Sequence, residues 1–245
     1  MHSRTAAAAA AAAGFASAKI VQVTSIAKNV KRLDLVINST APPFTFLPGQ
    51  WCDFYIESID EVSGYSMISS PLELPCFSLA VQQSKSKAAL HIHNEMKEND
   101  QLWVRSGGNV FWDGSDHKNA LMLAGGIGVT PYMSMVNHLA MSKEIQKTSN
   151  FCALVHSSKN NVLVNELQDI SNTLDSFYYQ HSVTNGSGSG RINLNDIERA
   201  LRSIKNQGTV IPMICGSEPF LKNMELMLIE SFDFQENEIM MEKWW

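Results

Sequence analysis

Three glycines stand close together after an apolar run, in the segment Leu121-Met122-Leu123-Ala124-Gly125-Gly126-Ile127-Gly128-Val129-Thr130-Pro131. Glycine permits a positive φ and lets a backbone approach a ligand with no Cβ in between, so we expect both from Gly125, Gly126 and Gly128. Thr130 suits the N-cap of a following helix, and Pro131 suits its first position. Amides at the positive end of a helix bind anions. The segment therefore predicts a phosphate site.

The spacing of these glycines differs from two common nucleotide motifs. It is neither the G-x-G-x-x-G of dinucleotide-binding folds nor the G-x-x-x-x-G-K-[ST] of nucleotide triphosphatases, because no lysine follows the glycines. A turn of this kind also serves as a plain connection between a strand and a helix. The loop by itself leaves both interpretations open.

Composition and charge narrow the class of protein. The 245 residues include 44% hydrophobic and 18% charged residues, which is typical of a globular protein of one large or two small domains. The formal net charge is -5 and the chain has no run of lysine and arginine, so we expect no nucleic-acid partner. No apolar stretch reaches the roughly 18 residues of a spanning helix, so we expect no membrane span.

Cysteines and histidines do not form a metal-binding pattern. The four cysteines are Cys52, Cys76, Cys152 and Cys215. They lack C-x-x-C pairing and are too widely spaced for a zinc site or a disulfide framework, so we expect reduced, intracellular thiols. His91 and His93 alternate near a predicted helix, but no further residues are spaced to complete a ligand set. We predict no metal site.

The N-terminal segment is basic and rich in alanine and serine. Residues 1 to 32 contain the basic residues Arg4, Lys19, Lys28, Lys31 and Arg32 and no acid. This composition predicts a mitochondrial transit peptide that is dispensable for folding. A low-complexity tail of a cytoplasmic protein and a secretory signal ending at Ala16-Ser17-Ala18 are the alternatives. We place the tail at residues 1–17.

The rest of the sequence divides into two halves that differ in their pattern of predicted strands and helices. Residues 18–114 carry short apolar segments between turn residues, which predicts an antiparallel β-barrel. The strands expected there are Ile20–Ile26, Leu33–Ile37, Trp51–Glu57, Phe77–Val81 and Leu102–Arg105, with a helix at Leu90–Lys97. In residues 115–245, strands near 120–124, 151–156, 177–183, 210–215 and 238–242 alternate with helices near 131–142, 162–173, 194–204 and 218–230. This alternation predicts an α/β domain with a doubly wound parallel sheet, which binds ligands at the carboxyl ends of its strands.

Several short segments match one family in consistent order. In the first half they are Leu47-Pro48-Gly49-Gln50, Gly64-Tyr65-Ser66 and Gly108-Asn109-Val110-Phe111. In the second half they are Gly125 to Pro131, Gly190-Arg191-Ile192 and Cys215-Gly216. They resemble the P-G-Q turn, the Tyr-Ser flavin motif, the G-P-x-G-x-F loop, the G-G-x-G-x-T-P loop, the G-R-[IV] segment and the C-G-P turn of the ferredoxin-NADP reductase family. The resemblance implies a barrel domain that binds flavin, followed by a domain that binds a nicotinamide nucleotide.

The resemblance also implies a function and a set of site residues. It implies an oxidoreductase that transfers hydride from NAD(P)H to noncovalent FAD and passes electrons to an acceptor that the sequence does not name. The cofactor-binding residues would be Gly64, Tyr65, Ser66, Gly108, Gly125, Gly126, Ile127, Gly128, Val129, Thr130, Pro131, Cys215 and Gly216. The residues implied at the reacting atoms are Tyr65, Ser66, Cys215, Glu242 and Trp245, with Trp245 as an aromatic gate over the flavin. His156 is interpreted either as a nucleotide contact or as an ordinary loop residue.

Departures from the family pattern concern the flavin. Ser63 stands where the family has an arginine that neutralises a flavin phosphate, and Ala89 stands where a serine caps the pyrophosphate-binding helix. Losing a charge-assisted phosphate contact costs about 1.5 to 3 kcal/mol, or about tenfold to a hundredfold in affinity. We expect weakened FAD binding, and a flavin-free module that binds NAD(P)H as a sensor or regulator remains the alternative.

The nucleotide preference depends on one further position. Thr184-Asn185 stands where family members that use NADP have a Ser-Arg pair. Asparagine cannot make the charge-assisted pairing that arginine makes with a phosphate, so we expect NADH to be preferred over NADPH. Lys159 and Arg191 are the basic residues that could compensate.

Overall fold

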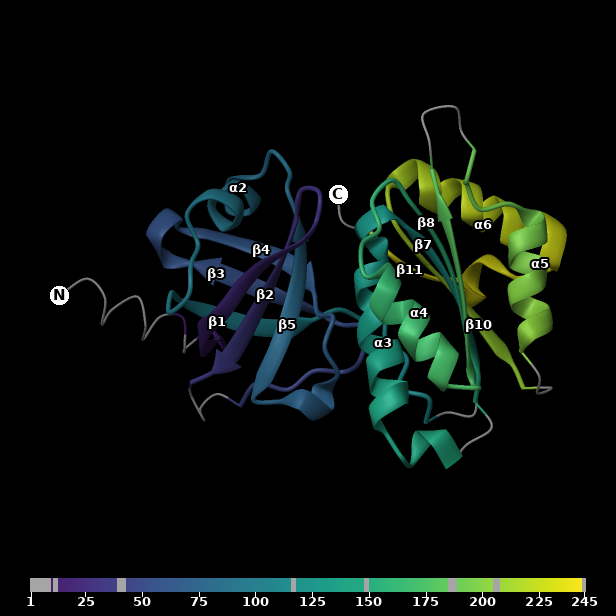
Figure 1. The fold of residues 1–245 in the computed structure, drawn as a ribbon, viewed down its shortest axis with the longest axis horizontal. Coiled ribbons are helices and arrows are strands. Elements are labelled where there is room, and N and C mark those ends of the chain that lie inside the picture. The colour runs from purple at the N-terminus through teal and green to yellow at the C-terminus, as the bar shows by residue number, and fades with distance from the viewer. Residues whose placement is uncertain are drawn as a thin grey trace.

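The computed structural model describes residues 10, 13–38, 43–115, 118–147, 150–184, 189–204 and 208–243. The first half forms a six-stranded antiparallel sheet and the second half a five-stranded parallel sheet, and the two lie next to each other in Figure 1. The predicted fold class, a barrel domain followed by an α/β domain, is confirmed. The predicted boundary at residue 114 falls between the last strand of the first sheet and the first strand of the second.

The barrel consists of β1 (Ala16–Ala27), β2 (Val30–Ile37), β3 (Trp51–Ile56), β4 (Glu61–Ser66), β5 (Cys76–Gln82) and β6 (Gln101–Gly107). Their order in the sheet is β4-β3-β6-β1-β2-β5. A bridge between Met67 and Leu79 brings the two ends of this order together. Alternate residues of each strand point inward, so Ile20, Leu33 and Phe54 form part of an apolar core.

Two local predictions in the barrel are wrong. The strand β4 was not expected, because its sequence E-V-S-G-Y-S contains few apolar residues and a glycine, which weakens a strand. The helix α2 (Lys87–Asn94) begins before the predicted start at Leu90. Its N-cap is Ser86, whose hydroxyl accepts a hydrogen bond from the Ala89 amide at 3.2 Å.

The prediction that residues 1 to 32 are dispensable for folding is also wrong. Strand β1 lies between β6 and β2, in the middle of the sheet, and Ala16 and Ala18 are buried in the core. The suggested secretory cleavage site therefore lies inside a strand. Lys19 occupies an outward position in the alternation of β1. A basic residue fits such a position, so Lys19 by itself does not indicate a transit peptide. Mitochondrial location stays a prediction.

The parallel sheet consists of β7 (Asn119–Gly125), β8 (Cys152–Ser158), β9 (Phe177–Val183), β10 (Val210–Cys215) and β11 (Met240–Glu242), in the order β11-β10-β7-β8-β9. Helices α3 (Thr130–Met141) and α4 (Val164–Thr173) pack on the face toward the barrel. Helices α5 (Leu194–Ser203) and α6 (Glu218–Phe232) cover the other face. None of the helices in the described ranges is long and apolar enough to cross a membrane.

The strand order reverses at β7, because the chain runs outward through β8 and β9 and then returns to β10 and β11. The loops that follow β7 and β10 leave the sheet on opposite sides, since α3 and α6 cover opposite faces. A crevice at the carboxyl ends of such strands is the usual ligand site of an open parallel sheet. The predicted phosphate loop and the Cys215-Gly216 turn lie on the two sides of this reversal.

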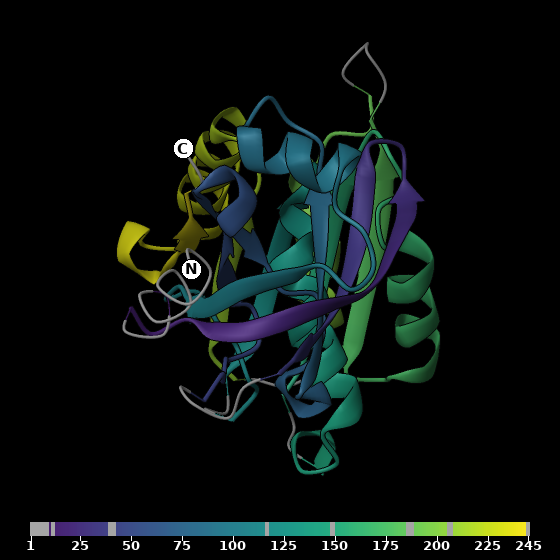
Figure 2. The ribbon, with the colours of Figure 1, turned by 90° about the vertical axis from the view of Figure 1, so that its left-hand side faces the viewer.

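Helix α3 also joins the parallel-sheet half to the barrel, and Figure 2 shows the barrel in front of it. The Ser134 hydroxyl donates to the Ser69 carbonyl at 2.7 Å, and the side-chain amide of Asn137 donates to the Ile68 carbonyl at 2.8 Å. The Ser70 hydroxyl and His138 Nδ1 lie 3.0 Å apart. The receiving segment follows directly on β4, which carries the predicted flavin motif.

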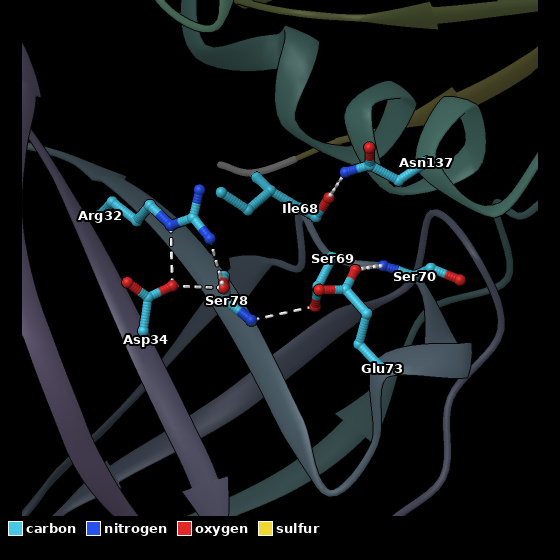
Figure 3. A network of polar contacts seen from close by, with 8 residues as sticks. All are labelled: Arg32, Asp34, Ile68, Ser69, Ser70, Glu73, Ser78 and Asn137. Carbon is cyan, nitrogen blue, oxygen red and sulfur yellow. Dashed lines mark hydrogen bonds and ion pairs between the residues drawn. The ribbon is translucent and has the colours of Figure 1, made fainter. Parts of the chain in front are cut away.

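The barrel side of this contact is held by polar side chains (Figure 3). The Ser78 amide donates to the Ser69 hydroxyl at 2.9 Å, and the Ser78 hydroxyl donates to Asp34 at 2.5 Å. Asp34 in turn accepts from Arg32 at 2.7 Å. Strands β2 and β5 thereby support the segment that α3 contacts.

Candidate functional site

The glycine loop forms a helical turn directly after β7. A 3-10 turn spans Gly126–Val129, and α3 follows from Thr130. Gly126 has a φ of 59°, whereas Gly125 has a φ of -108° and Gly128 is not in the positive region. The expectation of positive φ therefore holds for Gly126 and is wrong for the other two. A Cβ on Gly126 would meet no atom of the described residues within 4 Å, so this point of the loop is open as far as the described part of the chain goes.

Gly125 and Gly128 are glycines because other groups approach them closely. A Cβ on Gly125 would lie 2.8 Å from the Phe220 ring, and a Cβ on Gly128 would collide with the Cys215 carbonyl. Gly216 is equally close to Phe220, at 2.7 Å from a Cβ built on it. The loops after β7 and β10 thus pack directly on each other, and this packing requires the glycines with or without a ligand.

The start of α3 differs from the prediction by one residue. Val129, with no polar side chain, stands at the N-cap, and Pro131 follows in the first turn. The Thr130 hydroxyl donates to the Ile127 carbonyl at 2.9 Å instead of capping a helix amide. The 3-10 turn from Gly126 to Val129 precedes α3 directly, so the helical segment begins before Thr130. The first amides of a helical turn have no partner within it and are suited to an anion.

One row of paired positions crosses the five strands near their carboxyl ends. Cys215 pairs with Glu242 on one side and with Ala124 on the other, Ala124 pairs with His156, and His156 pairs with His181. Paired residues of neighbouring strands share a face, and Ala124 and Cys215 pack with α3 on the face toward the barrel. The structure therefore brings the predicted residues Cys215 and Glu242 together.

Glu242 reaches the barrel from this row. Its side chain is nearly buried, and Oε1 lies 3.1 Å from a Cβ built on Gly108, another predicted site residue. Oε2 has no hydrogen-bond partner among the described residues. Burial raises the pKa of the Glu242 carboxyl to about 7. The site therefore holds a carboxyl group that exchanges its proton near neutral pH.

Tyr132 in α3 is a neighbour of this group that the sequence did not single out. Its hydroxyl is buried and, within the described part of the chain, has no hydrogen-bond partner. Burial raises its pKa well above the ordinary value, with further contributions from Cys215 and Glu242. A tyrosine in an apolar stretch of helix carries no motif, and only the fold places it beside the row.

On the barrel side, Trp51 lies between two of the predicted site residues, Ser66 and Gly108. Ser66 pairs with Trp51 between β4 and β3, and Trp51 pairs with Gly107 between β3 and β6. The indole ring lies against the backbone of Gly107 and Gly108, where built Cβ atoms would be 2.5 Å and 2.7 Å from it. Ser66 and Gly108 therefore both adjoin Trp51, and Glu242 approaches the same Gly108.

Tyr65 points to the other face of β4. It pairs with the buried Cys52, and its ring meets the Phe54 ring edge-on at 6.0 Å between centroids. Its hydroxyl is buried and has no partner in hydrogen-bonding geometry in the described ranges. Burial raises the pKa of this phenol, and the nearby hydroxyls of Ser63 and Ser86 oppose the rise. Tyr65 thus lies beside the N-terminus of α2, and Gly64, paired with Asp53, lies on the face of Ser66.

Other predicted residues are placed apart from this group. Lys159 and Arg191 are exposed, and the Gly190 carbonyl accepts from the Ser157 hydroxyl at 2.9 Å. His156 is buried in β8 and is not a loop residue. Asn185, Trp244 and Trp245 lie outside the described residues, as does most of the predicted tail.

The barrel, the parallel sheet and the glycine loop at the point of strand reversal define a two-domain protein with a ferredoxin-NADP reductase-like fold. Residues 122–225 match the family described as Oxidoreductase NAD-binding domain. Oxidoreductase NAD-binding domain-containing protein 1 of Danio rerio is 30% identical over 254 residues, which cover 94% of this chain and 92% of that protein. The chain belongs to the oxidoreductase NAD-binding domain-containing protein 1 family.

Solved structures share the fold at low sequence identity. Phthalate dioxygenase reductase has a TM-score of 0.74 at 17% identity, covering 95% of this chain and 69% of that one. A ferredoxin NADP+ reductase from Neisseria gonorrhoeae with bound FAD and NADP has a TM-score of 0.74 at 20% identity, covering 94% and 99%. The family resemblance inferred from the sequence motifs is confirmed.

Proposed function

We propose that this protein is an NAD(P)H-dependent flavin reductase that passes electrons to a separate acceptor. The observation that carries the proposal is the open glycine loop at the point of strand reversal, next to Cys215 and close to the contact between Glu242 and Gly108. Membership of an oxidoreductase family supports the reaction class. The structural neighbour from Neisseria gonorrhoeae, which holds FAD and NADP, supports the choice of cofactors.

The nucleotide would be held by the loops of the parallel sheet. The amides of the turn that begins at Gly126 would bind the pyrophosphate, and Cys215 and Gly216 would contact the nicotinamide. Glu242 would hold a proton close to the barrel at neutral pH, because burial raises its pKa to about 7. The chain's part in the reaction is to orient the nucleotide toward the barrel.

The barrel residues fit a flavin in part. A buried hydroxyl without a partner costs about 1 to 3 kcal/mol, so the Tyr65 hydroxyl favours a ligand that supplies an acceptor beside α2. Ser63 and Ala89 supply neither a positive charge nor a capping hydroxyl there, although Ser86 already caps the helix. FAD, when bound, would connect the two-electron chemistry of the nucleotide with the acceptor. We therefore propose FAD binding of modest affinity.

Reconstitution tests this proposal. Purified full-length protein is incubated with FAD, passed through a desalting column and examined by absorbance, and the bound cofactor is released with acid and identified by chromatography. We expect a yellow protein that releases FAD. Recovery of FMN alone would overturn the choice of flavin, and a colourless protein after incubation with excess FAD would overturn the reductase.

A flavin-free nucleotide-binding module is the second candidate. Two observations favour it: the packing of the Tyr65 ring on the barrel core and the absence of an arginine at Ser63. This candidate predicts that the protein binds NADH but does not oxidise it when FAD is supplied. The same preparation, titrated with NADH by calorimetry and assayed for turnover, distinguishes the two.

A further inference from the structure

A buried histidine lies directly beneath the glycine loop. His156 in β8 is 0% exposed, and its two ring nitrogens have different partners. Nε2 lies 3.0 Å from the Gly126 carbonyl oxygen, and Nδ1 lies 3.2 Å from the Tyr179 hydroxyl. A carbonyl oxygen only accepts hydrogen bonds, so Nε2 must carry a proton.

The same contacts define the state of the ring. Burial lowers the pKa of His156 to about 3, helped by the neighbouring His181, so the ring carries one proton at neutral pH. With this proton on Nε2, Nδ1 is an acceptor and the Tyr179 hydroxyl is its donor. His181 has a separate partner, the Ser158 hydroxyl at 3.0 Å, and does not compete for either nitrogen.

Peptide geometry extends this contact to the ligand side of the loop. The peptide bond between Gly126 and Ile127 is trans, and the carbonyl and the N–H of a planar trans peptide point in opposite directions. Because the Gly126 carbonyl points to His156 in the sheet, the Ile127 N–H points away from it. Ile127 lies in the first turn of the helical segment, where amides have no partner within the turn.

We propose that His156 is a positioning residue for the pyrophosphate loop and that Tyr179 selects the ring tautomer that makes this possible. The inference rests on the proposed nucleotide binding. His156 does not touch the nucleotide: it holds the Gly126 carbonyl inward, and the Ile127 amide is thereby presented to the phosphate. Glycine at position 126 permits the positive φ that this orientation uses.

Calorimetric titration with ADP-ribose tests the proposal on the full chain, because this probe carries the pyrophosphate without the nicotinamide. We expect His156→Leu to weaken binding about tenfold, the usual effect of one lost hydrogen bond at this strength. His156→Gln, whose amide nitrogen can donate to the Gly126 carbonyl, should restore most of the affinity. Tyr179→Phe should weaken binding by a smaller factor, because the ring can then place its proton on Nδ1.

Two further readouts separate positioning from packing. In steady-state assays with NADH, His156→Leu should raise KM and leave kcat almost unchanged, since the chemistry lies elsewhere. The matched control is His93→Leu, which removes a histidine that contacts the Val81 carbonyl at 3.0 Å in the barrel. This control should leave the affinity for ADP-ribose unchanged.

Each failure has a different meaning. Equal binding by the wild type and a folded His156→Leu overturns the positioning role and leaves the proposed function standing. Loss of affinity in His156→Gln as large as in His156→Leu also overturns it, because the donor would then not matter. A wild-type protein that does not bind ADP-ribose overturns both proposals. If His156→Leu does not fold, the Gln and Phe variants decide by the same criteria.

Discussion

Gly126 and Gly128 are glycines for different physical reasons, and this difference is testable. No atom of the described residues lies near a Cβ built on Gly126, whose φ is 59°. Gly126→Val therefore adds no clash with this part of the chain, but it strains the backbone by about 1 to 2 kcal/mol and crowds the phosphate. Gly128→Ala would collide with the Cys215 backbone. We expect Gly126→Val to fold and to lose NADH turnover, and Gly128→Ala to lose stability. Unchanged turnover in folded Gly126→Val would remove the loop from the mechanism.

Glu242 predicts a pH-dependent stability. Its pKa is about 7 in the folded protein, compared with an ordinary value of 4.5, so the folded state binds the extra proton between these values. The stability linked to this proton is present below pH 4.5 and is lost as the pH rises through 7. Glu242→Gln should therefore be more stable than the wild type at pH 8, by about 1 to 3 kcal/mol, and similar to it at pH 5.

Thermal unfolding at the two pH values checks this prediction. The matched control is Glu230→Gln, which neutralises an exposed glutamate of α6. Its effect on stability should not differ between pH 5 and pH 8. A Glu242→Gln variant with the same pH independence would contradict a buried, proton-holding carboxyl.

NADH should be preferred over NADPH by about tenfold in kcat/KM, equivalent to about 1.4 kcal/mol. The physical reason is the lack of a Ser-Arg pair after β9, where Thr184 donates its amide to the Ser158 carbonyl at 2.9 Å. Lys159 and Arg191 are exposed and are the charges that could act on a 2′-phosphate. Steady-state kinetics with both nucleotides decides the matter. A higher kcat/KM for NADPH than for NADH would contradict this preference. If Arg191→Ala then lowered the value for NADPH, Arg191 would be the residue that binds the 2′-phosphate.

Among the elements, α3 has two functions, because it begins at the glycine loop and docks on the barrel. The Ser134 hydroxyl is buried and donates to the Ser69 carbonyl across the domain boundary. We expect Ser134→Ala to lower the free energy of unfolding by about 1 to 3 kcal/mol, because it leaves a buried carbonyl unpaired. The control is Ser203→Ala, since that hydroxyl donates to Ala200 in its own helix at 2.6 Å.

Urea unfolding of the two serine variants gives the comparison. The bond between Ser134 and Ser69 joins residues distant in sequence, whereas the bond of Ser203 is local and half-exposed. The interdomain variant should therefore lose more stability. Equal midpoints for both variants would mean that α3 is not held on the barrel by this contact.

Elements with a clear hydrophobic period could be predicted from the sequence, and elements set by tertiary contacts could not. The buried run before Gly125 and the amphipathic α5 were predicted from the pattern of apolar and polar residues along the chain. Strand β4 was missed because the pairing with β3, and not its own residues, makes it a strand. The basic residues of β1 were misread because a transit peptide and an outward strand face share the same composition.

In the candidate site, too, some residues could be predicted from the sequence and others could be found only from their tertiary contacts. Cys215, Glu242 and the glycine loop were identified from motifs, and the parallel sheet brings them to one edge. Tyr132 and Tyr179 carry no sequence signal, because their importance comes from the residues packed against them. Trp51 was likewise not singled out, although it lies between Ser66 and Gly108.

For the whole molecule, the arrangement of the two halves matters more than either site alone. Three buried polar groups have no hydrogen-bond partner among the described residues: Tyr132 Oη and Glu242 Oε2, near the boundary between the halves, and Tyr65 Oη, beside the N-terminus of α2. Groups of this kind cost stability in the free protein. We expect FAD and NADH together to raise the melting temperature more than either one does. Equal shifts with and without the second cofactor would indicate that the two sites are independent.

Reduction of the flavin by NADH in the absence of oxygen tests whether hydride passes between the two bound cofactors in this protein. FAD-reconstituted protein is mixed with NADH in a stopped-flow instrument without oxygen, and the visible absorbance of the oxidised flavin is followed, with the Gly126→Val variant as the control. We expect rapid loss of this absorbance in the wild type and little or none in the variant. Persistent flavin absorbance in the wild type at saturating NADH would contradict hydride transfer across the domain boundary.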